Sequence, residues 1–178
     1  MSDSPPLPLA NVRGFDEADL SFARLIAIVT PVALLGGAFI SQYMGGLYPC
    51  EMCVWQRWPH AVAIIFALDA SALRRRPPLS ALFAALAAVA IAVSGAIGVF
   101  HAGVEYGWWE GVTACTATVG NGSTQDVMNA IMAAPITRCD VAPWTLWGIS
   151  LAGFNAIFSL GAALLIFLAL AKARQDVK

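Results

Sequence analysis

The sequence predicts an all-α integral membrane protein built as a four-helix bundle. Of its 178 residues, 59% are hydrophobic and only 12% are charged, about half the charge of a typical soluble domain. The charged residues lie between long apolar runs, and three of these runs contain no Asp, Glu, Lys or Arg. They cover residues 25–47, 79–100 and 141–171, and each is long enough to cross a hydrocarbon core about 30 Å thick.

The fourth predicted span, residues 53–73, differs from the others because it contains Arg57, His60 and Asp69. Ionisable groups are costly in a bilayer, so this segment is either a functional span or no span at all. In the third run, alanines recur every four residues and predict a face of close helix packing. These are Ala84, Ala88, Ala92 and Ala96.

The start of this span, which is the second along the chain, is predicted from its length. Pro59 suits the first position of a helix, but a helix over residues 59–73 would be only ~22 Å long. That length is too short to cross a bilayer. We therefore expect the helix to begin with Pro49 in its first position. Pro59 then lies inside the helix and kinks it, which leaves the carbonyl of Trp55 without its helical partner.

The distribution of Lys and Arg predicts the orientation. Eight of the ten fall on one side of a four-span arrangement: Arg13, Arg24, Arg74, Arg75, Arg76, Lys172, Arg174 and Lys178. The other side holds Arg138, with Arg57 at the edge of a span. Because positive residues concentrate on the cytoplasmic side, both termini are expected in the cytoplasm. The net charge of −1 offers no support for nucleic-acid binding.

This orientation divides the chain into three parts. Residues 1–24 and 172–178 are expected to be cytosolic tails, and residues 25–171 form the transmembrane domain. We expect no cleaved signal peptide, because a mostly polar segment comes first. A long outer loop over residues 101–142 is expected to carry a short surface helix over residues 124–134, after a turn at Gly120-Asn121-Gly122-Ser123. Tryptophans flank this loop and are typical of a membrane interface; they are Trp108, Trp109, Trp144 and Trp147.

All four cysteines fall on the outer side, where disulfides persist. They are Cys50, Cys53, Cys115 and Cys139, and four cysteines allow three pairings. Proximity in the chain favours Cys50–Cys53, at the start of the second helix, where the helix dipole favours thiolate. The alternative to redox pairs is a structural zinc site made by the four cysteines, but the 23 residues between Cys115 and Cys139 do not match the usual close spacing. We therefore predict no metal.

Arg57 lies four residues after Cys53, on the same helix face one turn deeper. An arginine at membrane depth needs an anionic or polar partner, and a thiolate or the carbonyl oxygen of a lipid-soluble ligand would serve. The alternative is that Arg57 extends to the lipid headgroups. His101, at the outer end of the third span, is expected at the same level and could hydrogen-bond the same ligand, or be an interfacial histidine without a special role.

These residues resemble the DsbB family of bacterial disulfide bond formation proteins. The motif Cys50-x-x-Cys53-x-Trp55-Gln56-Arg57, the loop sequence Gly107-Trp108-Trp109-Glu110-Gly111 and the segment from Trp147 to Gly153 all match its pattern. The four-span layout with a widely spaced cysteine pair in a long outer loop is also similar. The resemblance covers roughly residues 24–171.

The resemblance implies a thiol–quinone oxidoreductase of the bacterial inner membrane. Its partner would be a periplasmic dithiol oxidase similar to DsbA, which forms a mixed disulfide with Cys115 and is reoxidised by the Cys115–Cys139 pair. Electrons would pass to Cys50–Cys53 by thiol–disulfide exchange, and then to ubiquinone or menaquinone from the membrane pool. Arg57, Cys53 and His101 would contact the quinone.

Two other classes of membrane protein are compatible with part of this pattern. Enzymes of the vitamin K epoxide reductase type also combine CxxC with two loop cysteines, but there the loop pair precedes the CxxC. A small channel or scaffold protein could use the disulfides as structural links only. Quinone content and thiol reactivity of the purified protein distinguish that class from an oxidoreductase.

Reporter fusions test the predicted orientation. Fusions after Arg76 and after Lys178 are expected to report the cytoplasm, because both positions follow clusters of positive residues. A fusion near Asn121 is expected to report the periplasm. A cytoplasmic signal at Asn121 would contradict the four-span arrangement and the compartment assigned to the cysteines.

Overall fold

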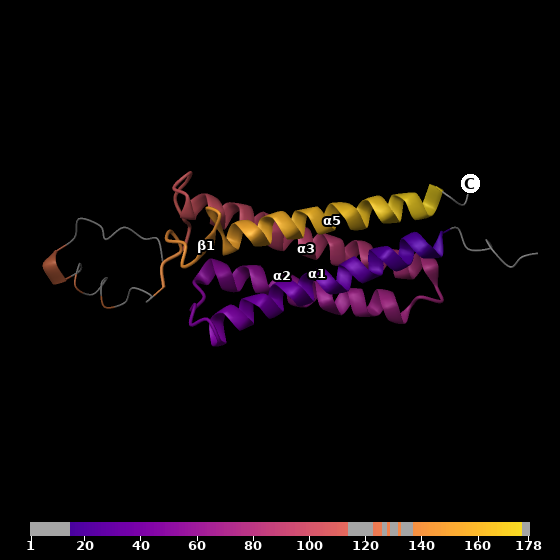
Figure 1. Cartoon of the computed structure of the whole chain (residues 1–178), viewed down its shortest axis with the longest axis horizontal. Coiled ribbons are helices and arrows are strands. Elements are labelled where there is room, and N and C mark those ends of the chain that lie inside the picture. The colour runs from indigo at the N-terminus through magenta and orange to yellow at the C-terminus, as the bar shows by residue number, and fades with distance from the viewer. Residues whose placement is uncertain (1–14, 114–122, 126–127, 129–131, 133–136, 176–178) are drawn as a thin grey trace, which may run out of the picture.

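The protein is a bundle of four long helices that lie side by side along one axis (Figure 1). A computed structural model describes residues 15–113, 123–125, 128, 132 and 137–175. The helices are α1 (Glu17–Tyr43), α2 (Glu51–Ala72), α3 (Pro77–Glu105) and α5 (Leu151–Gln175). An antiparallel pair of short strands, β1 (Thr145–Leu146) and β2 (Ile149–Ser150), precedes α5. The helical fold class predicted from the sequence is thus confirmed; the orientation in a membrane stays a prediction.

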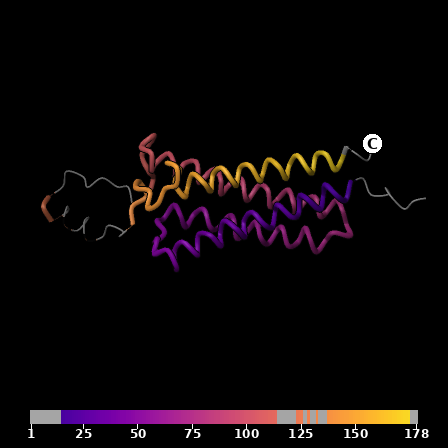
Figure 2. The backbone as a smooth tube through the Cα atoms, viewed as in Figure 1, coloured from indigo at the N-terminus to yellow at the C-terminus, as the bar shows by residue number. Residues whose placement is uncertain are grey.

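Each helix runs antiparallel to the one before it, and the main contacts follow a ring in which α1 packs on α2 and α5, and α3 packs on the same two helices. The start of α1, the α2–α3 turn and the end of α5 therefore share one end of the bundle (Figure 2). The arginines of the α2–α3 turn and the basic residues at the end of α5 lie at this end, as the charge distribution predicted. The α1–α2 connection, the strand pair and residues 106–113 and 137–142 of the outer loop lie at the other.

Three of the helices, α1, α3 and α5, are long and apolar enough to cross a membrane, which supports a membrane protein. Within the described part of the chain, α2 does not join this set, since its polar side chains lower its hydropathy. Its 22 residues nevertheless correspond to ~33 Å, and it packs lengthwise between α1 and α3. That α2 crosses the membrane stays a prediction.

Helix α1 begins at Glu17, within the segment assigned to the cytosolic tail. The Asp16 carboxylate accepts hydrogen bonds from the backbone N–H groups of Ala18 and Asp19, and so caps the helix. The Asp16 backbone N–H also donates to the Ala173 carbonyl oxygen at 2.8 Å. The start of α1 is therefore joined to the end of α5, which a hydropathy pattern cannot reveal.

The start of α2 also differs from the expectation. The helix begins at Glu51 with Cys50 as its N-cap, and Pro49 precedes the cap instead of occupying the first helical position. An N-cap accepts a hydrogen bond through its side chain, and the Cys50 sulfur does this for the backbone N–H of Cys53 at 3.3 Å. Pro59 lies inside α2, as predicted.

The predicted alanine face on α3 is only partly correct. Ala84 and Ala88 are buried, but Ala92 is half-buried and Ala96 is exposed. A step of four residues overshoots the helical repeat of 3.6, so the stripe drifts around the helix. The buried face continues instead through small residues that meet α5, among them Ser94, Gly95 and Gly98.

Gly98 tests this close packing. A Cβ atom there would lie 3.0 Å from the Ala152 carbonyl oxygen and 3.1 Å from the Ala156 nitrogen, whereas one at Gly36 would meet nothing within 4 Å. Because backbone atoms cannot move aside cheaply, Gly98→Ala is expected to destabilise the bundle by about 1–3 kcal/mol. The matched change Gly36→Ala should be neutral or stabilise by up to about 1 kcal/mol through helix propensity. Thermal unfolding in detergent measures both, and equal midpoints would contradict the predicted difference.

Candidate functional site

The CxxC cysteines lie together at the first turn of α2. The Cys50 thiol donates to the Cys53 sulfur over 3.0 Å, a separation greater than the roughly 2.05 Å of a disulfide bond. The structure therefore shows the pair as a dithiol. Cys50 is 5% exposed, and Cys53 is half-buried.

The two thiols are not equivalent. Its hydrogen bond to Cys53, together with burial, raises the pKa of the Cys50 thiol, so the proton of the pair stays on Cys50. The Cys53 sulfur accepts the hydrogen bond from the Cys50 thiol. Cys53 is the third residue of α2. The N-terminal turn of a helix stabilises negative charge, so this position suits a thiolate.

A loop cysteine joins the same cluster. Cys139 is fully buried and packs with Cys50, Met52 and Val104, and its sulfur accepts a hydrogen bond from the Thr113 hydroxyl at 3.3 Å. The structure thus brings together three of the four cysteines singled out in the sequence. Cys115 lies outside the described residues, as does most of the predicted 124–134 helix. The Cys115–Cys139 pairing therefore stays a prediction.

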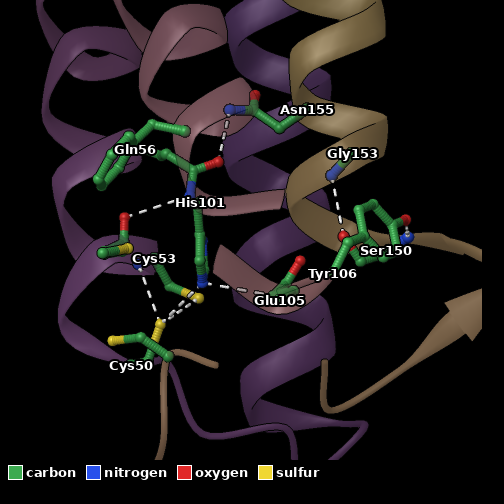
Figure 3. A network of polar contacts seen from close by, with 12 residues as sticks. Cys50, Cys53, Gln56, His101, Glu105, Tyr106, Ser150, Gly153 and Asn155 are labelled. Atoms are coloured by element: carbon green, nitrogen blue, oxygen red, sulfur yellow. Dashed lines mark hydrogen bonds and ion pairs between the residues drawn. The ribbon is translucent and has the colours of Figure 1, made fainter. Parts of the chain in front are cut away.

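His101 from α3 is 1% exposed and faces the CxxC (Figure 3). Its Nε2 atom lies 3.5 Å from the Cys50 sulfur and 3.7 Å from a carboxylate oxygen of Glu105. Its Nδ1 atom lies 2.8 Å from the side-chain nitrogen of Gln56. The sequence predicted the level of His101 along the bundle but not these partners. Glu105, whose second oxygen is buried without a hydrogen-bond partner among the described residues, was not singled out.

Gln56 fixes the tautomer of His101. Its side-chain nitrogen also donates to the Met52 backbone carbonyl at 3.2 Å, and a carbonyl oxygen can only accept. This atom is therefore the amide N–H₂ group, which donates to His101 Nδ1. A neutral His101 then carries its proton on Nε2, between the Cys50 sulfur and Glu105.

The same network continues into α5. The Asn155 side-chain nitrogen donates to Gln56 Oε1 at 2.7 Å and to the Ser94 backbone carbonyl at 3.2 Å, while Asn155 Oδ1 lies 2.8 Å from His60 Nε2. A layer of paired polar groups therefore crosses the bundle just below the CxxC. Sequence reasoning missed Gln56 and Asn155 as site residues. The available signal was an amide side chain inside a predicted span.

Arg57 finds a polar partner in α1. Its Nη1 atom donates to Gln42 Oε1 at 2.6 Å, and its Nη2 atom lies 3.5 Å from the Ala38 carbonyl oxygen. The guanidinium carbon also lies 5.1 Å from the centre of the Phe39 ring, within cation–π range. These contacts hold the guanidinium between α1 and α2, and the guanidinium has further N–H donors beyond those two.

A pocket of about 230 Å³ opens beside Cys53 and Arg57, between α1, α2 and α5. Most of its walls are apolar side chains and helix backbone. Its polar lining includes Cys53, Gln56, Arg57, His60 and Asn155 from α2 and α5, with Ser41 and Tyr48 from α1 and the connection that follows it. His101 is not among the lining residues; it hydrogen-bonds Gln56, which lines the pocket. The structure thus places His101 beside the dithiol and next to a lining residue. An apolar pocket with a few convergent polar groups is typical of a small-molecule site.

The site also offers ligands for a metal ion. The sulfurs of Cys50 and Cys53 and one ring nitrogen of His101 all lie within 4.8 Å of one another, and Cys and His are the usual zinc ligands. The zinc alternative weighed on the sequence used four cysteines. Here a histidine joins the CxxC, and Cys139 packs against Cys50.

Comparisons with known proteins agree with the geometry. The family model described as "Disulfide bond formation protein DsbB" matches residues 21–169. A curated relative from Rickettsia prowazekii (strain Madrid E), "Uncharacterized protein RP370", is 28% identical over 150 residues, which cover 83% of this chain and 84% of the relative. No solved structure gives a significant match.

Proposed function

This chain belongs to the DsbB family of disulfide bond formation proteins, and we propose that it reoxidises a periplasmic dithiol oxidase similar to DsbA with a membrane quinone as electron acceptor. The position of Cys53 is the observation that carries this proposal. Its partner Cys50 packs against the loop cysteine Cys139, while Cys53 itself lines the pocket that contains Arg57. One dithiol thus adjoins a disulfide-exchange partner and a small-molecule site.

The loop pair would exchange with the CxxC through Cys50. Cys115 would form the mixed disulfide with the partner oxidase, and the resulting Cys115–Cys139 dithiol would be reoxidised by a Cys50–Cys53 disulfide. Attack by the Cys139 thiolate on the Cys50 sulfur would break the Cys50–Cys53 bond, form a Cys139–Cys50 disulfide and release Cys53 as the thiolate. The helix terminus stabilises that leaving group, and a better-stabilised thiolate leaves faster. Attack by Cys115 on the Cys139 sulfur would then restore the Cys115–Cys139 bond and release Cys50. Two electrons and two protons pass from the partner to the CxxC in each cycle.

The pocket fits a quinone because it combines apolar walls with a guanidinium beside a thiol. A quinone bound there, ubiquinone or menaquinone, would take up the two electrons and two protons of the dithiol. Arg57 would donate to a carbonyl oxygen of the ligand and stabilise the Cys53 thiolate at the same time. Gln42 and Phe39 orient its guanidinium for this role.

His101 would act on the dithiol rather than on the ligand. Its Nε2–H group faces the Cys50 sulfur, with Glu105 on the same side. It can therefore donate a hydrogen bond to Cys50 and stabilise that sulfur when it is negative during exchange. This replaces the ligand contact that the sequence suggested for His101.

Anaerobic mixing tests the function directly. The protein is mixed with a reduced DsbA-like protein and a soluble quinone, and quinone absorbance is followed. We expect loss of one quinone per dithiol oxidised, and no loss with Cys53→Ser. A channel or scaffold with structural disulfides would consume no quinone, and that result would contradict the proposal.

Arg57→Ala is expected to weaken quinone use in this assay while leaving folding nearly intact. A hydrogen bond from a charged group contributes about 1.5–3 kcal/mol, and each 1.4 kcal/mol corresponds to tenfold, so the quinone KM should rise by about tenfold or more. Arg57→Lys should keep part of the activity, since it retains a point charge without the planar fork.

Arg75→Ala is the matched control, because Arg75 lies in the turn at the far end of the bundle. It should leave the quinone titration unchanged. If Arg57→Ala also matches the unmodified protein across the titration, Arg57 does not contact the quinone.

A further inference from the structure

His60 carries a hydrogen-bond acceptor that the mechanism above does not use. The residue is 3% exposed and lines the same pocket as Cys53 and Arg57. Its Nε2 atom is paired with Asn155, but its Nδ1 atom is buried and has no hydrogen-bond partner among the described residues. Buried polar atoms are rarely left unpaired in folded proteins. Such an atom beside a pocket points to a partner that arrives with the ligand.

Asn155 determines which nitrogen of His60 carries the proton. The Asn155 amide nitrogen is identified by its hydrogen bond to the Ser94 backbone carbonyl, which can only accept. The atom that faces His60 is therefore the amide oxygen, and it accepts from His60 Nε2–H. In a neutral imidazole the other nitrogen is then a bare acceptor, so Nδ1 presents a lone pair.

The two redox forms of a quinone differ in what they offer to such an acceptor. The oxidised form has only carbonyl oxygens, which accept hydrogen bonds, whereas the hydroquinone has hydroxyl groups that also donate. Arg57 has only N–H donors and can serve either form. His60 follows it by three residues, on a neighbouring part of the same helix face, with an axial rise of ~4.5 Å. Both residues line the same pocket, so one ligand can contact both of them through different oxygens.

We propose that the pocket binds hydroquinone more tightly than quinone, through a hydrogen bond from a ligand hydroxyl to His60 Nδ1. This inference rests on the proposed function. It assigns to His60 a contact that favours the reduced ligand, and to Asn155 the role of positioning residue that holds the imidazole in the accepting tautomer.

Preferential binding of the reduced form raises the reduction potential of the bound ligand. The electron balance is that of the proposed reaction: Cys50 and Cys53 lose two electrons and two protons, and the ligand gains them. His60 keeps its own proton throughout. A tenfold preference for the hydroquinone corresponds to about 30 mV for this two-electron couple. The pocket would thereby increase the drive to oxidise a partner that is itself a strong oxidant.

Equilibrium binding tests this without turnover. The full chain with Cys50→Ser and Cys53→Ser, purified in detergent, is titrated anaerobically by calorimetry with 2,3-dimethoxy-5-methyl-1,4-benzoquinone and, separately, with its hydroquinone. We expect tighter binding of the hydroquinone. Adding His60→Phe keeps a planar ring and should reduce that preference about tenfold, mainly by weakening hydroquinone binding. Asn155 Oδ1 then still accepts from the Ser159 hydroxyl at 3.0 Å, which helps this variant to fold.

Leu34→Ala is the matched control, because Leu34 lines the pocket with an apolar side chain and should weaken both forms by a similar factor. An unchanged preference in His60→Phe, with both forms still bound, would overturn the inference and leave the proposed function in place. Failure of either form to bind the parent chain would contradict the proposed function itself. Should His60→Phe fail to fold, His60→Leu is the second variant, with the same expected loss of preference; an unchanged ratio there overturns the inference.

Discussion

The hydrogen bond between Gln56 and Asn155 joins α2 to α5 inside an apolar bundle, and the geometry of the site depends on it. Both amides are anchored by backbone carbonyls, Gln56 by that of Met52 and Asn155 by that of Ser94. Reversing either amide would bring its oxygen against a backbone carbonyl oxygen, and neither of those atoms can donate. Because one amide faces His101 and the other faces His60, a single pair sets the hydrogen-bonding character of both imidazoles.

The asymmetry of the CxxC follows from its place at a helix start. Burial and the hydrogen bond to Cys53 raise the pKa of the Cys50 thiol, and the third helical position gives Cys53 the stabilising field of the helix terminus. Cys50 packs in one cluster with Cys139, and Cys53 lines the pocket. A two-residue spacer therefore separates a surface suited to exchange with another disulfide from a surface suited to a lipid-soluble oxidant.

Features that depend on local sequence could be predicted, and those that depend on distant pairs could not. The apolar runs predicted the long helices, and the length needed to span a bilayer predicted that α2 continues upstream of Pro59, since both are properties of one segment. The cap residue was not predicted, because capping depends on contacts of individual side chains. The pairing of Gln56 with Asn155 joins residues 99 apart in the chain, and that of Arg57 with Gln42 depends on how α1 and α2 cross. The drift of the alanine stripe on α3 shows the same limit: an integer spacing approximates a helix face over only a few turns.

The contact between Arg57 and Gln42 has a consequence for biogenesis. If α2 crosses the membrane as predicted, its guanidinium adds an insertion cost of at most about 2.5–3.5 kcal/mol on translocon scales, which makes α2 the hardest of the four helices to release into lipid. Its polar partner, however, is only 15 residues earlier and has already been synthesised when α2 emerges from the ribosome. Two successive helices that satisfy each other's polar groups can leave the translocon together as a hairpin. The order of segments along the chain is thus part of how this site is assembled.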